Sequence, residues 1–175
     1  IVLYASVMNS FFVSDDFDWL ETGDISIFFR PVTLVSFKLN YLIGGQNPFS
    51  YHAFNLLLHV LNAYLLFLLI SALLTYFNIT LDVKFEGVLE RSLKGTFIPD
   101  GNRLIAFLGA FLFLVLSSHS ESVTWLSGRT NLLSMAFMLL SLYAYIQSRF
   151  KNCVKCLIFS LSFFFLALLA KEAVL

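Results

Sequence analysis

The strongest transmembrane signal in this chain is the stretch Ala53-Phe-Asn-Leu-Leu-Leu-His-Val-Leu-Asn-Ala-Tyr-Leu-Leu-Phe-Leu-Leu-Ile70. Its residues are apolar apart from Asn55, His59 and Asn62, and apolar flanks extend it from Tyr51 to Phe77. A helix needs about 20 predominantly apolar residues to cross a bilayer. The sequence therefore predicts a membrane helix over residues 51–77.

Four polar side chains share one side of this predicted helix. His52, Asn55, His59 and Asn62 stand at offsets of 0, 3, 7 and 10, which an α-helix places within about 80° of arc. The polar seam either joins this helix to its neighbours or lines a substrate groove. The two histidines lie about 10 Å apart along the helix, which argues against a shared metal ion.

The composition is that of a membrane protein. The 175 residues are 59% hydrophobic, 17% aromatic and 13% charged, whereas soluble domains are about 45–50% apolar and about 25% charged. The formal net charge is zero. Nucleic-acid binding needs an excess of Lys and Arg to neutralise phosphates, so we expect no nucleic-acid partner.

Further apolar runs predict an all-α, polytopic transmembrane bundle. Membrane helices are expected at 104–118, 131–148 and 154–170, with a polar connection at 78–103. Residues 1–13 are too short to span a bilayer, so we interpret them as the end of a truncated first helix. We expect the chain to be a fragment of a longer polytopic protein, forming part of one transmembrane domain over residues 1–175.

Residues 14–50 are predicted to form an acidic loop that contains an interfacial helix. Pro31 suits the first turn of a helix, and Gly44 with Gly45 provides a stop. Apolar residues between them recur at spacings of three and four, at Val32, Val35, Leu39 and Leu42. The segment is too short to span, which favours an amphipathic helix in the membrane interface.

The distribution of basic residues predicts the orientation. Placing 78–103 and 149–155 in the cytoplasm puts seven Lys and Arg residues inside and four outside, in agreement with the positive-inside rule. The chain's most reactive side chains then share the external face. They are Asp15, Asp16, His119, Glu121, Arg129, Lys171 and Glu172.

Cys153 and Cys156 form a Cys-x-x-Cys pair, which in other contexts is a redox or metal motif. No second Cys or His pair stands nearby to complete a zinc site. We interpret the pair as a chance spacing.

Four sequence blocks resemble membrane glycosyltransferases of the GT-C superfamily. They are Asn9-Ser-Phe-Phe-Val-Ser-Asp-Asp-Phe17; Phe29-Arg-Pro-Val-Thr33 with Asn47-Pro-Phe-Ser-Tyr-His-Ala-Phe-Asn-Leu-Leu-Leu-His-Val-Leu-Asn-Ala63; His119-Ser-Glu-Ser-Val-Thr-Trp-Leu-Ser-Gly-Arg-Thr-Asn-Leu-Leu-Ser134; and Leu169-Ala-Lys-Glu172. The chain looks most like the O-mannosyltransferases with transmembrane and tetratricopeptide regions, and their bacterial relatives. The blocks occur in that family's order.

The resemblance implies a membrane enzyme whose first external loop carries an acidic active-site residue. The donor would be a polyprenyl-phosphate-linked sugar and the acceptor a hydroxyl of a protein or glycan. The enzyme would lie in a bacterial inner membrane with an external active face, or in the endoplasmic reticulum membrane of a eukaryote. It also implies further helices beyond this chain. The connection at 78–103 is longer than a tight helix connection in this family, which leaves the subfamily open.

Asp15 and Asp16 are the candidate catalytic bases, because inverting transfer needs a carboxylate to accept the acceptor's proton. The alternative is that both are solvated loop residues. Arg129 and Lys171 are candidates to bind the departing phosphate, and the alternative for each is an interfacial anchor. The full set of predicted substrate-binding residues is Arg30, His52, Asn55, His59, His119, Glu121, Arg129, Lys171 and Glu172.

No cofactor is predicted, although the Asp15–Asp16 pair leaves a divalent cation open. A transporter, or a structural or assembly subunit, is the alternative to an enzyme. A transporter predicts acidic residues at mid-bilayer depth, whereas no acidic residue lies inside an apolar run here.

Overall fold

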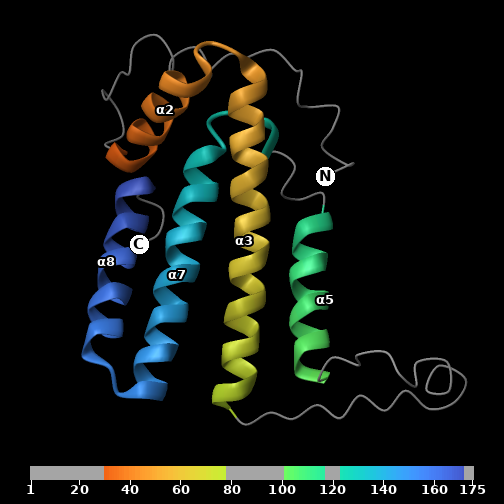
Figure 1. Ribbon diagram of the computed structural model, residues 1–175, viewed down its shortest axis with the longest axis vertical. Coiled ribbons are helices and arrows are strands. Elements are labelled where there is room, and N and C mark those ends of the chain that lie inside the picture. The colour runs from red at the N-terminus through yellow and green to blue at the C-terminus, as the bar shows by residue number, and fades with distance from the viewer. Residues whose placement is uncertain (1–29, 78–100, 117–122, 172–175) are drawn as a thin grey trace, which may run out of the picture.

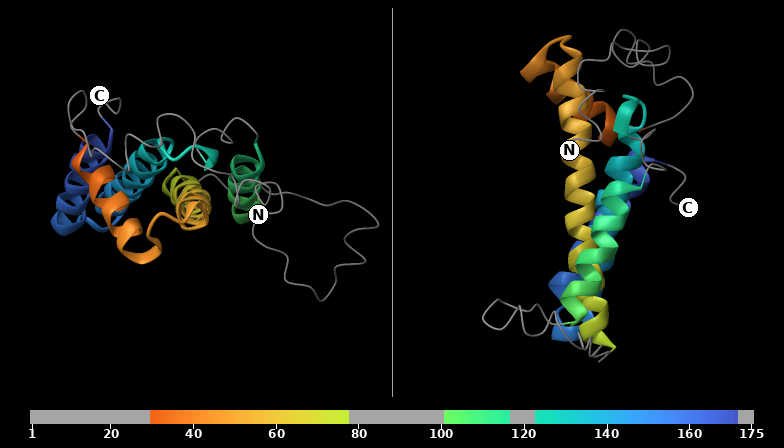
Figure 2. Two further views of the ribbon diagram at one scale, coloured as in Figure 1. Left: turned by 90° about the horizontal axis from the view of Figure 1, so that it is seen from above. Right: turned by 90° about the vertical axis from the view of Figure 1, so that its right-hand side faces the viewer.

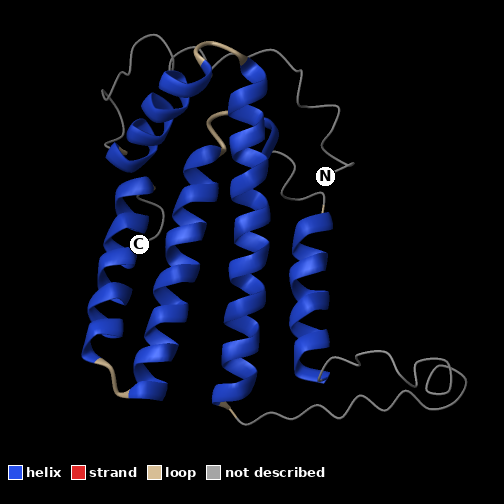
Figure 3. Cartoon of the chain, in the orientation of Figure 1, coloured by secondary structure: helices blue, strands red, loops and turns tan. Residues whose placement is uncertain are grey.

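The computed structural model describes residues 30–77, 101–116 and 123–171, and the regular elements in these ranges are helices (Figure 3). The all-α prediction is confirmed for this part of the chain. The helices are α2 (Pro31–Gly44), α3 (Pro48–Tyr76), α5 (Gly101–Val115), α7 (Arg129–Lys151) and α8 (Val154–Ala170). The expected helix end at 1–13 and most of the expected acidic loop lie outside the described residues.

Four of the helices stand side by side, and α2 lies across one end of them (Figures 1 and 2). α7 packs between α8 and α3, and α3 packs between α7 and α5. α3 and α7 run away from α2, whereas α5 and α8 run toward it (Figure 1). The helix ends that flank 78–100 and 152–153 are therefore at the end of the bundle far from α2.

The longest helix, α3, begins three residues before its predicted start. Asn47 caps it, because its Oδ1 accepts a hydrogen bond of 3.1 Å from the backbone N–H of Phe49. Pro48 then occupies the first turn, where its missing N–H is not needed. At 29 residues α3 is about 43 Å long, more than the hydrocarbon core of a bilayer requires.

Two helices, α3 and α7, are long and apolar enough to cross a membrane, whereas α5 and α8 are apolar but shorter. The predicted 154–170 helix is observed with those bounds. α5 begins at Gly101, so residues 101–103 belong to a helix and not to the polar connection. α7 exceeds its predicted range at both ends and stops where Asn152 adopts the left-handed conformation.

The outer surface of the bundle is apolar. Phe107 and Phe111 on α5, and Ile158 and Phe165 on α8, each expose half or more of their surface. The interior between α3 and α7 is also apolar, with a buried cluster of Leu65, Leu69, Ala136, Leu139 and Ile146. A helix bundle that is apolar inside and outside has lipid as its solvent.

The predicted helix after Pro31 is confirmed, and its apolar stripe faces away from the bundle. Val35, Leu39 and Leu42 are all more than half exposed. The opposite face turns toward the bundle and is largely polar; its buried residues are Thr33, Ser36, Phe37 and Asn40. α2 is thus amphipathic with its polar face inward, which suits a helix that contacts lipid outside and a polar centre inside.

Candidate functional site

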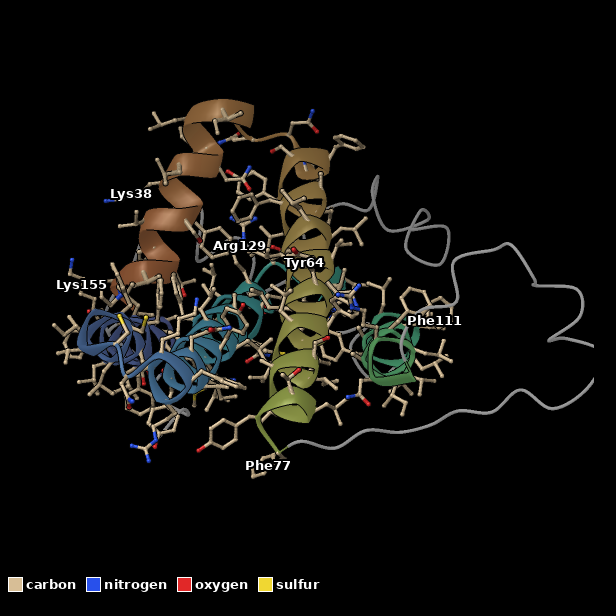
Figure 4. All side chains as sticks on the ribbon, turned by 60° about the horizontal axis from the view of Figure 1, so that its bottom comes forward. Lys38, Tyr64, Phe77, Phe111, Arg129 and Lys155 are labelled. Carbon is tan, nitrogen blue, oxygen red and sulfur yellow. The ribbon has the colours of Figure 1, made fainter. Side chains whose placement is uncertain are left out.

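The polar centre beneath α2 is formed around Arg129, whose side chain is fully buried. Figure 4 shows it between α2, α3 and the start of α7. Nε donates to Asn55 Oδ1 at 2.8 Å. Nη2 donates to Asn40 Oδ1 at 2.9 Å and to the Tyr51 carbonyl at 3.2 Å. The guanidinium therefore connects three helices through neutral oxygen acceptors.

Three aromatic rings surround the guanidinium. Its central carbon lies 4.3 Å from the ring centroid of Phe37, 4.7 Å from that of Phe54 and 5.5 Å from that of Tyr51. All three distances are within the range of cation–π attraction. The rings offset part of the free energy of removing a cation from water, and they also exclude water from the site.

The described helices carry no carboxylate that could neutralise this cation. All eleven Asp and Glu residues of the chain lie outside residues 30–77, 101–116 and 123–171, whereas eight of its eleven Lys and Arg residues lie within them. A buried charge without an opposite charge is strongly destabilising. Any counter-charge for Arg129 has to come from another part of the chain or from a ligand.

A tight turn fixes where α7 begins. The backbone N–H of Gly128 donates to Trp125 O at 3.2 Å, and that of Arg129 donates to Leu126 O at 2.9 Å. Thr130 Oγ1 donates to Ser127 O at 2.9 Å. Leu126 is fully buried against Phe37 and Tyr51, so the turn is held by the same aromatic residues that surround the guanidinium.

A second basic residue, Lys171, lies at the same end of the bundle. It is the C-cap of α8, and its Nζ donates to the Asn131 side-chain oxygen on the first turn of α7. The preceding carbonyl, Ala170 O, accepts a hydrogen bond of 3.1 Å from Thr33 on α2. Lys171 is partly buried, whereas Arg129 has no exposed surface.

The polar seam of α3 contacts neighbouring helices. Asn55 Nδ2 donates to Trp125 O at 3.1 Å, and Asn62 Nδ2 donates to Leu132 O at 3.0 Å. His59 Nε2 lies 3.3 Å from Leu114 O in the last turn of α5, a contact that the Nε2–H tautomer makes as donor. These are the contacts expected of a seam that joins helices. Substrate binding by His52, Asn55 and His59 stays a prediction.

The interfacial-anchor interpretation of Arg129 is wrong, because a side chain with no exposed surface cannot reach headgroups. The same burial gives no support to direct contact between Arg129 and a phosphate. Arg30 is the N-cap of α2 and is partly buried. The other predicted site residues lie outside the described residues: Asp15, Asp16, His119, Glu121 and Glu172.

Sequence reasoning missed most of the side chains that hold Arg129. Asn40 was not among the predicted site residues, yet its side-chain oxygen is one of the main acceptors. The signal was present in the spacing of Thr33, Ser36 and Asn40, which repeats every three to four residues opposite the apolar stripe. Phe37, Phe54 and Tyr51 carried no signal of their own in an aromatic-rich chain.

No group of three or more His, Cys, Asp or Glu side chains gathers in the described part of the chain in a way that could hold a metal ion. The Asp15–Asp16 pair lies outside the described residues. A divalent cation at the pair stays a proposal.

Comparisons with known proteins find several relatives of about 30–33% identity. The chain is 33% identical to protein O-mannosyl-transferase TMTC1 of Homo sapiens over 126 residues, which is 72% of this chain and 12% of that protein. It is also 33% identical to TMTC1 of Mus musculus over 141 residues, or 80% of this chain and 12% of the relative. The chain is related in sequence to the protein O-mannosyl-transferases. These matches support the family resemblance.

The relationship extends to insect members of the group. Protein O-mannosyl-transferase Tmtc1 of Drosophila melanogaster is 30% identical over 143 residues, 82% of this chain and 14% of the relative. The chain thus spans only about an eighth of the length of the curated relatives it matches. No family model matches the chain, and no solved structure matches it.

Several sequence blocks resemble the O-mannosyltransferases, and the parts of these blocks that the structure describes meet at one end of the bundle. Thr33 in the second block bonds to Ala170 in the last. Asn55, from the part of the second block on α3, bonds to Arg129 in the third block. Lys171 in the last block bonds to Asn131 in the third. Residues far apart in sequence are therefore brought together at the end of the bundle where Arg129 lies.

Proposed function

We propose that the full-length protein is a membrane O-mannosyltransferase that transfers mannose from a polyprenyl-phosphate-linked donor to a hydroxyl of a protein acceptor. Transfer takes place on the external face, at the end of the bundle that carries α2. The observation that carries the proposal is the convergence of the described family blocks at that end. The names of the relatives support mannose as the sugar and a protein as the acceptor.

The proposed reaction inverts the anomeric carbon. The acceptor oxygen forms a bond to that carbon while the carbon–oxygen bond to the phosphate breaks, and the polyprenyl phosphate leaves with the bonding electrons. A carboxylate accepts the hydroxyl proton. Asp15 or Asp16 is the proposed base.

Cations at the same end suit the departing phosphate. Lys171 is partly buried and its ammonium is held by Asn131, and a lysine ammonium can bind phosphate as a point charge. Arg30 precedes α2 at this end of the molecule. Among the described residues, the charged side chains at this end are all basic, which suits an anionic donor.

The test is a transfer assay with the full-length protein in membranes. It compares a set of polyprenyl-phosphate sugars as donors for wild type, Asp15→Asn and Asp16→Asn. Asp24→Asn, in the same acidic segment, is the matched control. We expect wild type and the control to transfer mannose, and one of the two Asn variants to insert normally but lose transfer.

Two other results would change the conclusion. Equal rates for all variants would make the acidic segment a solvated loop and would remove the proposed base. Failure of wild type with every donor would favour a transporter or an assembly subunit. Binding of the donor without transfer would point to a transporter.

A further inference from the structure

Arg129 has two features that do not fit a phosphate ligand. Its side chain has no exposed surface, and its Nε and Nη2 donors already bond to Asn55, Asn40 and the Tyr51 carbonyl at 3.2 Å or less. The remaining terminal nitrogen, Nη1, makes a contact of 3.5 Å with Ser36 O. A phosphate would have to displace packed protein groups to reach the guanidinium.

The contacts of Arg129 join α2 to the rest of the bundle. Two acceptors, Asn40 Oδ1 and Ser36 O, belong to α2, and two others, Asn55 Oδ1 and Tyr51 O, belong to α3. The donor itself is the first residue of α7. A planar guanidinium with five N–H donors can bond in these directions at once, whereas a lysine ammonium at the end of a flexible chain cannot.

Two further polar contacts attach α2 to other helices in the described part of the chain. Thr33 donates to Ala170 O on α8, and Asn40 Nδ2 donates to Ser50 Oγ on α3 at 3.0 Å. The outer face of α2 is apolar and exposed. Arg30 directly precedes α2, so the position of α2 determines where the acidic segment at 14–29 joins the bundle. A shift of α2 would move that point.

We infer that Arg129 is a positioning residue that fastens α2 to α3 and α7 and so fixes where the acidic segment joins the bundle. The inference rests on the proposed function for its effect on transfer, but the fastening of α2 stands apart from it. Arg129 then affects the rate of transfer by holding α2 in position, and it does not contact the sugar or the phosphate.

The first experiment measures transfer by Arg129→Lys and Arg129→Gln in the full-length protein, with Arg149→Lys and Arg149→Gln as controls. Arg149 is exposed in the last turn of the same helix. Because a misplacement of about 1 Å can reduce a rate by about 10²-fold, we expect kcat to fall on that order in both Arg129 variants. The donor KM should stay nearly unchanged, and the controls should behave as wild type.

The second experiment follows α2 without using transfer. Thr33→Cys and Ala170→Cys are introduced together after Cys153 and Cys156 have been changed to Ser, and oxidation then crosslinks α2 to α8. The two sites are adjacent, since Thr33 Oγ1 lies 3.1 Å from Ala170 O. We expect crosslinking to slow in Arg129→Gln and to stay unchanged in Arg149→Gln.

The crosslink also offers a rescue. If Arg129 acts only by fastening α2, the disulfide between positions 33 and 170 restores transfer to Arg129→Gln. Should Arg129→Gln not fold, Asn40→Ala removes one α2 acceptor of Arg129, together with the bond from Asn40 to Ser50, and leaves the bond between Arg129 and Asn55 intact. It should lower crosslinking and kcat in the same direction by a smaller factor.

Several results overturn the inference. One is a raised donor KM in Arg129→Gln, with activity retained in Arg129→Lys and no rescue by the crosslink, which would make Arg129 a ligand of the phosphate. Another is unchanged crosslinking in both Arg129→Gln and Asn40→Ala. If wild type transfers no sugar, the proposed function fails, and the crosslinking result still decides whether Arg129 fastens α2.

Discussion

Arg129 Nε donates to Asn55 Oδ1 at 2.8 Å, across 74 residues of sequence. The same amide uses its nitrogen to donate to Trp125 O at 3.1 Å. Asn55 therefore accepts from the cation with one atom and donates to the turn before α7 with the other. Only a side chain that both accepts and donates can satisfy these two neighbours.

Asn55→Leu should destabilise the protein markedly. It leaves the Arg129 Nε–H and the Trp125 carbonyl without their partner, and each buried polar group left unpaired costs about 1–3 kcal/mol. Asn55→Asp should lie between wild type and Leu, since it keeps the acceptor and supplies a charge but loses the donor. The measurement is the thermal unfolding midpoint of the detergent-solubilised full chain.

Gln46→Leu is the control for this series, because Gln46 is an exposed amide just before α3. Its unfolding midpoint should match that of wild type. If Asn55→Leu were as stable as Gln46→Leu, the bond between Asn55 and Arg129 would be of no consequence to the fold.

Gly44→Ala should disturb the corner between α2 and α3. A Cβ at Gly44 would lie 2.5 Å from the Ser50 Cβ and closer still to its Oγ. Ser50 Oγ accepts a hydrogen bond of 3.0 Å from Asn40, the residue that holds Arg129 from α2. We expect slower crosslinking between cysteines at 33 and 170, and lower transfer.

Gly109→Ala is the matched control for the glycine substitution. Its Cβ would lie 3.0 Å from Cδ1 of Ile70, the free end of a side chain that can rotate away. It should leave both crosslinking and transfer near wild type. Equal effects of the two substitutions would show that general packing, and not the α2 corner, determines the result.

Ser141 and Ser160 should be energetically coupled. Ser141 Oγ donates to Ser160 O, and Ser160 Oγ donates to Ser141 O, each at 2.9 Å. Polar contacts of this kind between membrane helices average about 0.6 kcal/mol in double-mutant cycles. We expect a coupling of about that size from Ser141→Ala, Ser160→Ala and the double variant.

The cycle is measured by reversible unfolding in mixed micelles. Ser162→Ala is the control, because the Ser162 hydroxyl bonds within its own helix, to Ile158 O, and is exposed. It should change the free energy of unfolding by less than about 0.5 kcal/mol. Additive effects of the Ser141 and Ser160 substitutions would contradict the predicted coupling.

Cys153 should alkylate at lower pH than an ordinary thiol. A hydrogen bond from the Cys156 side chain lowers the pKa of Cys153, with smaller contributions from the backbone of Cys156 and Lys155 and from the charge of Lys151. Only the thiolate reacts. A lowered pKa means that the thiolate, and with it the reaction rate, rises earlier as the pH increases.

Cys156→Ala tests the cause of that shift. Without the Cys156 thiol, the alkylation profile of Cys153 should move to higher pH. Mass spectrometry of iodoacetamide adducts at a series of pH values gives the profile. A profile unaffected by Cys156→Ala would show that the neighbouring thiol does not stabilise the Cys153 thiolate.

The sequence was sufficient to predict the helices because apolar runs and their stop residues are local signals. The α8 range 154–170 matches the structure, and α2 differs at its end by a single residue. The predicted helix boundaries were wrong where a capping residue determines the end of the helix. Asn47 starts α3 three residues early, and Asn152 lets α7 continue to Lys151.

The centre around Arg129 could be predicted only in part. The distribution of basic residues assigned Arg129 to the external end of the molecule. The family resemblance placed it in a block that begins at His119. The burial of Arg129 depends on Asn40, Tyr51 and Asn55, which are 74 to 89 residues away along the chain. Periodicity indicates that a helix has two faces, but it does not indicate which neighbour each face meets.

The short connection between α7 and α8, only Asn152 and Cys153 long, has a consequence for biosynthesis. The apolar stretch of α7 has a mean hydropathy of 1.2, against 2.2 for that of α3, so α7 partitions weakly into lipid by itself. With its Ser141 hydroxyl paired to Ser160, α7 presents less polar surface when it enters together with α8. We expect the two helices to leave the translocon as a hairpin, with α8 carrying α7 into the bilayer.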